Sequence, residues 1–282
     1  MTKGLVLEGG AMRGLFTAGV MDFLMEKDAK FDIAAGVSAG AAFGCNIKSK
    51  QIGRVLRYNL AYCDDPRYCS RQSLIRTGDL FGAEFCYHTI PDELDPFDTN
   101  TFDSNPMKFY AVCSDANTGR PVYKLLDKAG YDCYEWIRAS ASMPLVSRVV
   151  KIDGYELLDG GMTDSIPLKF IQNKGAQRTL VVLTQPREYV KKRNRALPLM
   201  RIALRRYPRL LEAIANRHNP YNAQRRLVFE QEKRGKIIVI CPDSPLLIGK
   251  TEHNPENMKR VYNLGRAAAE KKWDEIREYF SN

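Results

Sequence analysis

The stretch Gly36-Val37-Ser38-Ala39-Gly40 decides the fold, because it puts a serine at a sharp turn between a strand and a helix. Residues 31–35 before it read as a short buried strand, and residues 39–43 begin a helical pattern. A strained strand-turn-helix corner holds a serine hydroxyl above the edge of a sheet, where a hydrolase keeps its nucleophile. Gly36 and Gly40 allow the backbone and a substrate to approach closely. We therefore expect Ser38 to be the nucleophile of such an elbow.

A glycine-rich turn follows the first predicted strand, residues 4–7, and leads into a helical pattern over residues 15–24. Unpaired backbone N–H groups at such a turn bind either a phosphate or a developing oxyanion. A dinucleotide site would need a glycine at position 11, and the phosphate-loop pattern is absent. We therefore expect an oxyanion hole for acyl transfer, with the N–H groups of Gly10, Ala11 and their neighbours as donors. The turn comprises Gly9, Gly10, Ala11, Met12, Arg13 and Gly14.

An aspartate follows the strand-like residues 155–158 and opens the turn Asp159-Gly160-Gly161. An Asp-Gly pair alone is usually a turn former or a helix cap. A serine nucleophile needs a base, however, and the chain has three histidines in segments that predict surface or satisfied core side chains. Asp159 is then the better base, taking the proton of Ser38 directly in a Ser-Asp dyad. The three histidines are His88, His218 and His253.

In this order the three pieces resemble the patatin-like phospholipase family, and specifically its bacterial members of about this length. The resemblance rests on the oxyanion turn at 9–14, the Gly-x-Ser-x-Gly elbow at 36–40 and the Asp-Gly-Gly at 159–161. The small residues at 139–144 are also similar to the segment that enters the family's dyad strand. Together these segments span roughly the first 170 residues.

The resemblance implies a three-layer α/β/α fold with a mainly parallel central sheet. It also implies a serine acyl-enzyme mechanism with no metal or other cofactor, acting on lipid acyl esters. Ala11 stands where the family usually has its third glycine. Because a methyl group fits there only if the residue avoids a positive φ, we expect a narrowed or reshaped oxyanion hole and an effect on rate. Arg13 suits two roles, holding the turn through its carbonyls or meeting a lipid phosphate.

Composition indicates a single enzyme-sized domain. The chain has 282 residues, of which 44% are hydrophobic and 27% charged. Seven scattered cysteines with no C-x-x-C pair argue against a disulfide framework or a zinc site. The first strand begins by Gly4, which leaves no secretory signal, and no apolar run reaches the roughly eighteen residues of a membrane span. We expect a cytoplasmic protein.

Beyond the motifs, the sequence predicts one patatin-like domain. We divide it into a catalytic core over about 1–185, a basic segment over 187–236, and a final strand and C-terminal helix over 236–282. The finer pattern predicts a helix over 41–64, a cap of loops and short helices over 65–105, a hairpin over 109–123, a helix over 134–140, buried parallel strands at 179–184 and 236–240, and a last helix over 256–280.

The net charge of +10 comes from one stretch. Residues 187–236 contain fifteen Lys or Arg and four Asp or Glu. Leucines and isoleucines alternate there with arginines, which suits either an anionic bilayer surface or a solvated basic face with its leucines turned inward. No nucleic-acid-binding motif is present, so we expect no nucleic-acid partner. The arginines that would meet the bilayer are Arg201, Arg205, Arg206 and Arg209.

The sequence therefore predicts a serine hydrolase that cleaves acyl esters of phospholipids or related lipids through Ser38 and Asp159, with peripheral contact to anionic membranes. The same apparatus would also serve a carboxylesterase, a thioesterase or an acyltransferase. A further alternative is a membrane-surface binding protein whose catalysis is weak because of Ala11.

Overall fold

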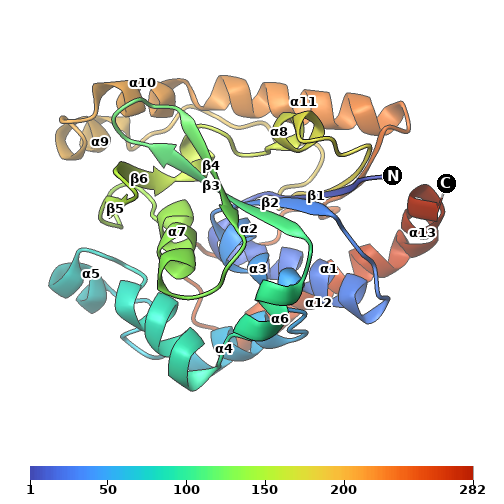
Figure 1. Cartoon of the computed structure of the whole chain (residues 1–282). Coiled ribbons are helices and arrows are strands. Elements are labelled where there is room, and N and C mark those ends of the chain that lie inside the picture. The colour runs from blue at the N-terminus through green and yellow to red at the C-terminus, as the bar shows by residue number, and fades with distance from the viewer. Residues whose placement is uncertain (282) are drawn as a thin grey trace.

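The computed structural model describes residues 1–281 as one eight-stranded sheet between two layers of helices (Figure 1). The strand order is β5-β6-β3-β2-β1-β7-β8, with β4 paired to β3 outside this path. Five neighbouring strands from β3 to β8 are parallel, which confirms the predicted three-layer α/β/α fold with a mainly parallel sheet. The strands are β1 (Lys3–Leu7), β2 (Ile33–Val37), β3 (Lys108–Asp115), β4 (Pro121–Leu126), β5 (Val150–Ile152), β6 (Tyr155–Asp159), β7 (Arg178–Val182) and β8 (Ile237–Ile240).

Helices cover both faces of the sheet (Figure 1). One layer contains α1, α7 and α12, and the other contains α8, α10 and α11. The helices are α1 (Gly14–Glu26), α2 (Ala39–Ala42), α3 (Cys45–Lys48), α4 (Arg54–Tyr62), α5 (Arg71–Thr77), α6 (Thr99–Ser104), α7 (Tyr131–Ala141), α8 (Leu168–Asn173), α9 (Leu197–Ala203), α10 (Pro208–Asn216), α11 (His218–Lys233), α12 (Pro255–Lys271) and α13 (Trp273–Ser281). Two short 3-10 turns, η1 (Ala11–Arg13) and η3 (Gly160–Met162), and the π-helical segment η2 (Phe85–Leu94) complete the described elements.

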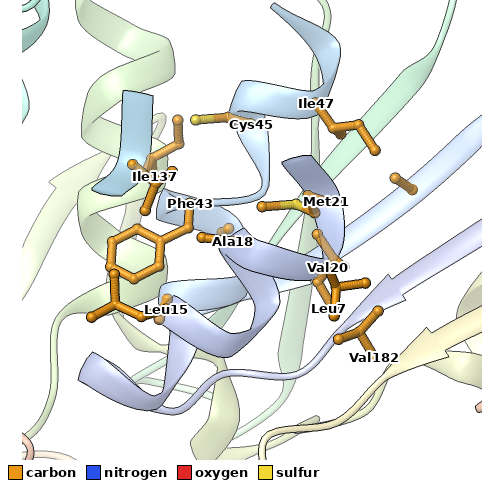
Figure 2. Packing of buried hydrophobic residues seen from close by; sticks show 14 of the residues in the cluster. Leu7, Leu15, Ala18, Val20, Met21, Phe43, Cys45, Ile47, Ile137 and Val182 are labelled. Atoms are coloured by element: carbon orange, nitrogen blue, oxygen red, sulfur yellow. The ribbon is translucent and has the colours of Figure 1, made fainter. Parts of the chain in front are cut away.

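The central strands are buried on both faces, as their uniformly apolar sequences predict. In β1, Leu5 and Leu7 belong to the core beneath α1, whereas Val6 points into the core beneath α8 and α11. Figure 2 shows the first of these cores, where Leu7 and Val182 of the sheet lie beside Val20 of α1. Burial of these side chains fixes α1, and with it the turn that precedes α1, against the sheet.

Two predicted helices are shorter than expected. The helix predicted over 41–64 is divided into α2, α3 and α4. The break between α3 and α4 arises because Lys50 and Gly53 adopt positive φ values of 54° and 77° that a right-handed helix cannot continue. The last helix, predicted over 256–280, is interrupted at Lys272 between α12 and α13. The predicted cap over 65–105 is confirmed as α5, η2 and α6 with their loops.

Helices α1 and α12 touch through their backbones, since each has a glycine at the crossing. A methyl group on Gly19 of α1 would lie 2.0 Å from the carbonyl oxygen of Tyr262. A methyl group on Gly265 of α12 would lie 1.9 Å from the carbonyl oxygen of Phe16. No larger residue fits at either position without moving a helix, so this contact ties the C-terminal part of the chain to the start of the fold.

Strand β3 brings two distant strand ends together. One edge of β3 pairs with β4 along residues 109–114, so β2 and β6 must share the other edge. Strand β2 pairs parallel to β3 as far as Val37 opposite Val112. Strand β6 pairs antiparallel and ends with Asp159 opposite Cys113. The C-terminal ends of β2 and β6 therefore face each other at adjacent residues of β3.

Replacement of Gly265 tests the contact between α1 and α12. Alanine is favoured over glycine inside a helix by roughly 1 kcal/mol. We nevertheless expect Gly265→Ala to lower the free energy of unfolding by about 1–3 kcal/mol, because the new methyl group overpacks against α1. The exposed Asn263→Ala on the same helix is the matched control and should be neutral or slightly stabilising. Urea unfolding measures both; a Gly265→Ala protein as stable as wild type would contradict the close approach.

Candidate active site

Ser38 stands at the corner between β2 and α2. Its φ of 56° and ψ of −124° lie in a region that non-glycine residues rarely adopt, at a cost of about 1–3 kcal/mol. Gly36 and Gly40 make the corner tight, since a methyl group on Gly36 would lie 2.2 Å from the Gly40 carbonyl oxygen. Only 7% of Ser38 is exposed, so the hydroxyl lies in a site largely shielded from water. The predicted strand-turn-helix position of Ser38 is confirmed.

The glycine-rich turn after β1 packs directly on this corner. A methyl group on Gly9 would lie 2.7 Å from the Ser38 Cβ atom, and one on Gly40 would lie 2.3 Å from the Leu7 carbonyl oxygen. Within residues 1–281, no hydrogen bond uses the backbone N–H groups of Gly10 or Ala11. These two free donors next to the serine are what an oxyanion hole requires.

Ala11 departs from the sequence-based expectation. Its φ is 48°, so the residue adopts the left-handed conformation that we expected it to avoid. The expectation failed because the turn must reverse within three residues to begin α1, and this geometry is imposed by the packing of Gly9 and Gly14 against the elbow. A left-handed alanine costs about 1–2 kcal/mol relative to its ordinary conformation.

Asp159 ends β6 and lies opposite the elbow. Its side chain is 3% exposed and accepts a hydrogen bond of 2.8 Å from the backbone N–H of Gly161. Burial raises the pKa of Asp159, while the nearby Ser38 side chain and the positive charge of Arg217 act in the opposite direction. The structure therefore brings the two predicted dyad residues to one cavity, at strand ends that face adjacent residues of β3.

Ser140, in the last turn of α7, joins the two strand ends. The backbone N–H of Ser38 donates to the Ser140 Oγ atom at 2.9 Å, and that hydroxyl donates to the Val112 carbonyl at 2.6 Å. Two residues later, the Ser142 carbonyl accepts from the backbone N–H of Asp159 at 2.8 Å. The sequence pattern at 139–144 indicates small residues but not this role, because the Ser38–Ser140 contact joins positions 102 residues apart.

A family model described as patatin-like phospholipase matches residues 5–170, which is more than half of the chain. The chain belongs to the patatin-like phospholipase family. Ser38, Asp159 and the turn at 9–14 all fall within the matched region. The resemblance found in the sequence is confirmed at the level of the family and of its α/β/α fold.

Two curated relatives illustrate the range of the family. The chain is 32% identical over 192 residues to the uncharacterized protein YjjU of Escherichia coli, covering 64% of this chain and 52% of YjjU. It is 27% identical over 185 residues to the lysophospholipase NTE1 of Candida albicans, covering 64% of this chain and 13% of NTE1. The chain thus spans about half the length of the first relative and a small part of the second.

Among solved structures, VipD from Legionella pneumophila matches 97% of this chain and 67% of its own chain. The TM-score is 0.46 and the sequence identity is 14%, so this likeness adds nothing to the family assignment.

A second family model, a domain of unknown function (DUF6363), matches residues 207–281. This segment includes β8 and the helices from α10 to α13. It reaches the patatin-like site through Tyr221, whose hydroxyl donates to the buried carboxylate of Glu8 at 2.5 Å. Glu8 also accepts from the backbone N–H of Thr184 at 2.7 Å, and the Thr184 hydroxyl donates to the Gly9 carbonyl at 2.9 Å. The segment therefore braces the oxyanion turn.

Two cavities of opposite character flank Ser38. One of about 110 Å³ is lined by apolar and aromatic side chains of the elbow, α7 and the cap, among them Phe43, Tyr87 and Met143. The other, of about 800 Å³, contains Asp159 and is lined by the oxyanion turn, the loop after β7 and the start of α11. Ser38 thus faces both an apolar and a polar compartment.

The Arg13 side chain points into the larger, polar cavity. Its Nε atom is buried without a hydrogen-bond partner within residues 1–281, and no carbonyl of the turn accepts from its guanidinium group. Of the two roles considered from sequence, holding the turn through its carbonyls is therefore absent from the structure.

The three histidines differ in environment. His88 is buried beside Glu135, with 3.0 Å between Nε2 and Oε1, and the His253 ring contacts the Cys63 carbonyl. These two match the expectation of satisfied side chains. His218 does not, because it lines the polar cavity with an Nδ1 atom that has no partner among residues 1–281. No hydrogen bond in this described range joins His218 to Ser38.

Within residues 1–281, no three His, Cys, Asp or Glu side chains lie close enough together to hold a metal ion. The same residues include no helix of the length and apolar character that crossing a membrane requires.

Substitutions in the oxyanion turn test its role. Gly10→Val should lower turnover of an ester substrate about a hundred- to a thousandfold, because its side chain would collide with Thr184 and displace a donor. Ala11→Gly should keep or raise turnover and be at least as stable as wild type, since glycine tolerates the positive φ. Steady-state kinetics with thermal unfolding as the folding control measures both. A folded Gly10→Val protein with wild-type turnover would show that the turn does not face the reacting carbonyl.

Proposed function

We propose that this chain is a serine lipid acyl hydrolase in which Ser38 is the nucleophile and Asp159 is its base. The observation that carries the proposal is that Ser38 and Asp159 line one cavity where β2 and β6 meet on β3, beside the free N–H groups of Gly10 and Ala11. Family membership supports lipid acyl esters as the substrate class. The apolar cavity supports a place for the acyl chain, and the polar cavity a place for the leaving alcohol.

The proposed reaction has two halves. The Ser38 Oγ atom attacks the ester carbonyl while its proton passes to Asp159, and the oxyanion is stabilised by the N–H groups of Gly10 and Ala11. When the tetrahedral intermediate collapses, the ester bond breaks and the leaving alcohol takes the proton from Asp159. Water then attacks the acyl-serine, giving its proton to Asp159 and releasing the carboxylic acid as Ser38 recovers its hydrogen. A thiol ester, or an acceptor other than water, would give the thioesterase and acyltransferase alternatives.

The dyad is tested by Ser38→Ala, Asp159→Asn and the double variant. Each single change should lower ester hydrolysis by roughly a thousandfold or more, and the double variant should be no worse, because the two groups act as one unit. A fluorophosphonate probe should label wild type and fail to label Ser38→Ala. His218→Ala is the control: loss of activity there with near-normal turnover in Asp159→Asn would replace the dyad by a Ser-His arrangement. Failure of wild type to label would favour a binding protein.

The raised pKa of Asp159 gives this test a pH dependence. The base must be ionised, so kcat/KM should fall as pH drops through a pKa above the ordinary 3.8. A carboxyl whose folded-state pKa is raised destabilises the folded protein at pH values above that pKa. At neutral pH, Asp159→Asn should therefore unfold at the same temperature as wild type or higher. Calorimetry between pH 4 and 8 checks the sign of the difference in unfolding temperature between Asp159→Asn and wild type.

We also propose that α9 and α10 contact an anionic membrane surface. Both helices bury one side, including Met200 and Leu210, against the rest of the fold. The outer side of α9 keeps the apolar side chains of Leu199 and Ile202 at 62% and 72% exposure. The arginines of this surface, namely Arg201, Arg205, Arg206 and Arg209, are all exposed.

Reversing these four arginines to glutamate should weaken binding to anionic vesicles strongly, because basic residues near such a surface contribute about 1 kcal/mol each. The effect should shrink at high salt. Vesicle sedimentation at two ionic strengths measures it, and hydrolysis of a small soluble ester reports folding. A matched control reverses four exposed cations elsewhere, Lys27, Lys30, Arg234 and Lys236. Equal losses in both variants would mean that net charge, and not this surface, sets membrane affinity.

A further inference from the structure

A chain of buried hydrogen bonds leads from α11 to the oxyanion turn. The Tyr221 hydroxyl donates to the Oε1 atom of Glu8 at 2.5 Å, and the Glu8 Oε2 atom accepts from the backbone N–H of Thr184 at 2.7 Å. The Thr184 hydroxyl donates in turn to the Gly9 carbonyl at 2.9 Å. Glu8, Thr184 and Tyr221 are each at most 3% exposed. A buried polar network in which each member has a partner holds its groups rigidly.

The last bond of this chain fixes the direction of an oxyanion donor. The Gly9 carbonyl and the Gly10 N–H belong to one planar trans peptide group, so they point in opposite directions. The bond from Thr184 therefore holds the carbonyl on the Thr184 side and directs the N–H to the other side. A hydrogen bond accepted by the carbonyl also polarises the peptide group, which makes the Gly10 N–H a stronger donor.

Tyr221 determines which acceptor the Thr184 hydroxyl serves. That hydroxyl has one hydrogen and two acceptors nearby, the Gly9 carbonyl at 2.9 Å and the Glu8 Oε2 atom at 3.3 Å. Because the Tyr221 hydroxyl and the Thr184 N–H already supply one donor to each carboxylate oxygen, Glu8 leaves the Thr184 hydroxyl to Gly9. Without the Tyr221 hydroxyl, the carboxylate would compete with Gly9 for this hydrogen.

Cations of the polar cavity offset the negative charge of Glu8. An uncompensated carboxylate near the hole would oppose a developing oxyanion. The Nζ atom of Lys191 lies 4.4 Å from the centre of the Tyr221 ring. Burial lowers the pKa of Lys191 to about 8 and also lowers the pKa of Arg217, while the charge of Glu8 acts in the opposite direction on both groups. Glu8 is therefore near enough to both cations for its charge to be balanced.

We propose that Glu8, Thr184 and Tyr221 are positioning residues that aim the Gly10 N–H at the oxyanion formed from the ester carbonyl. This inference rests on the proposed hydrolase function, because that function gives the Gly10 N–H its place in the oxyanion hole. The three side chains act through the peptide group between Gly9 and Gly10 and not on the reacting atoms. A donor that is already in position is effective because it needs no reorganisation when the negative charge develops.

The proposal gives the segment at 207–281 a part in the reaction. Tyr221 lies in α11, within the residues that match the domain of unknown function. Glu8 and Gly10 lie within the residues that match the patatin-like model, and Thr184 lies outside both matches. The oxyanion turn would thus depend on two side chains from beyond the patatin-like match.

The test compares two inhibitors with the same alkyl chain, octyl trifluoromethyl ketone and octyl methyl ketone. The fluorinated ketone takes up the Ser38 Oγ atom at its carbonyl carbon and then carries an oxyanion in the hole, whereas the methyl ketone stays a neutral ketone. The ratio of their inhibition constants therefore reports on the hole and cancels changes in binding of the alkyl chain. Wild type should bind the fluorinated ketone much more tightly.

Thr184→Val keeps the shape of the side chain and removes its hydroxyl. This change should reduce the ratio by about tenfold or more, and kcat should fall while KM changes little, because the lost interaction acts in the transition state. Thr184→Ser restores the hydroxyl and should recover most of the ratio. Tyr221→Phe should also reduce the ratio. An unchanged ratio in either folded variant, Thr184→Val or Tyr221→Phe, would overturn the proposal.

Tyr262→Phe is the matched control for Tyr221→Phe. The Tyr262 hydroxyl donates to the buried Asp22 carboxylate at 2.7 Å, so this change removes the same type of bond from the same segment. Asp22 lies about two turns into α1, away from the oxyanion turn. Tyr262→Phe should keep the wild-type ratio even where it lowers the unfolding temperature. Equal losses of the ratio in both variants would show that the ratio follows stability and would overturn the positioning role.

Hydrogen exchange separates the positioning of the turn from the chemistry. Amide exchange over residues 8–14, followed by mass spectrometry, should be faster in Thr184→Val than in wild type or Tyr262→Phe. If wild type hydrolyses no ester and no fluorophosphonate labels Ser38 while this exchange pattern holds, the proposed function fails and the hydrogen-bonded support of the turn stands. If wild type hydrolyses esters while Thr184→Val changes neither the exchange nor the inhibitor ratio, the proposed function stands and the positioning role fails.

Discussion

The shared edge of β3 is the constraint on which the site depends. Because β4 occupies one edge, β2 and β6 meet end to end on the other, at Val112 and Cys113. No helix or loop has to reach across the molecule to bring Ser38 to Asp159. Ser140 then fixes the junction, since its hydroxyl bonds both the Ser38 backbone and the Val112 carbonyl. One buried side chain thus ties the backbone of the elbow to the backbone of β3.

The parts of the site that the sequence predicted are local ones. The elbow at Ser38, the glycine turn at 9–14 and the aspartate after β6 each depend on a strand ending in a specific turn, and such signals lie within about ten residues. The positive φ of Ala11 was missed because it is imposed by packing against the elbow, a contact between segments nearly thirty residues apart. The helix breaks at Lys50 and Lys272 could not be predicted from the sequence, because no proline marks either position.

The polar cavity shows a second feature that the sequence alone does not predict, namely which basic side chains point inward. The excess of basic residues over 187–236 was visible in the sequence, and the arginines of α9, α10 and the turn between them are exposed. Composition could not separate these from Lys191 and Arg217, which turn inward beside Ser38. Whether a basic side chain of this stretch points inward or outward depends on where β7 and α11 lie relative to the elbow. The order of the strands in the sheet determines that placement. A single charged run thus divides into an outer surface and an inner one.

The cations of the polar cavity act electrostatically on Asp159, the proposed base. Burial disfavours the charged form of Asp159, yet the proposed reaction needs that form at neutral pH. Arg217 and Lys250 both lower the pKa of Asp159, so they help to keep it ionised without forming an ion pair that would hold it away from Ser38. A direct ion pair would have stabilised the carboxylate more and weakened it as a base. Arg217 and Lys250, on the segment at 207–281, therefore act on Asp159 from a distance, and the carboxylate keeps its hydrogen bond from the Gly161 N–H beside Ser38.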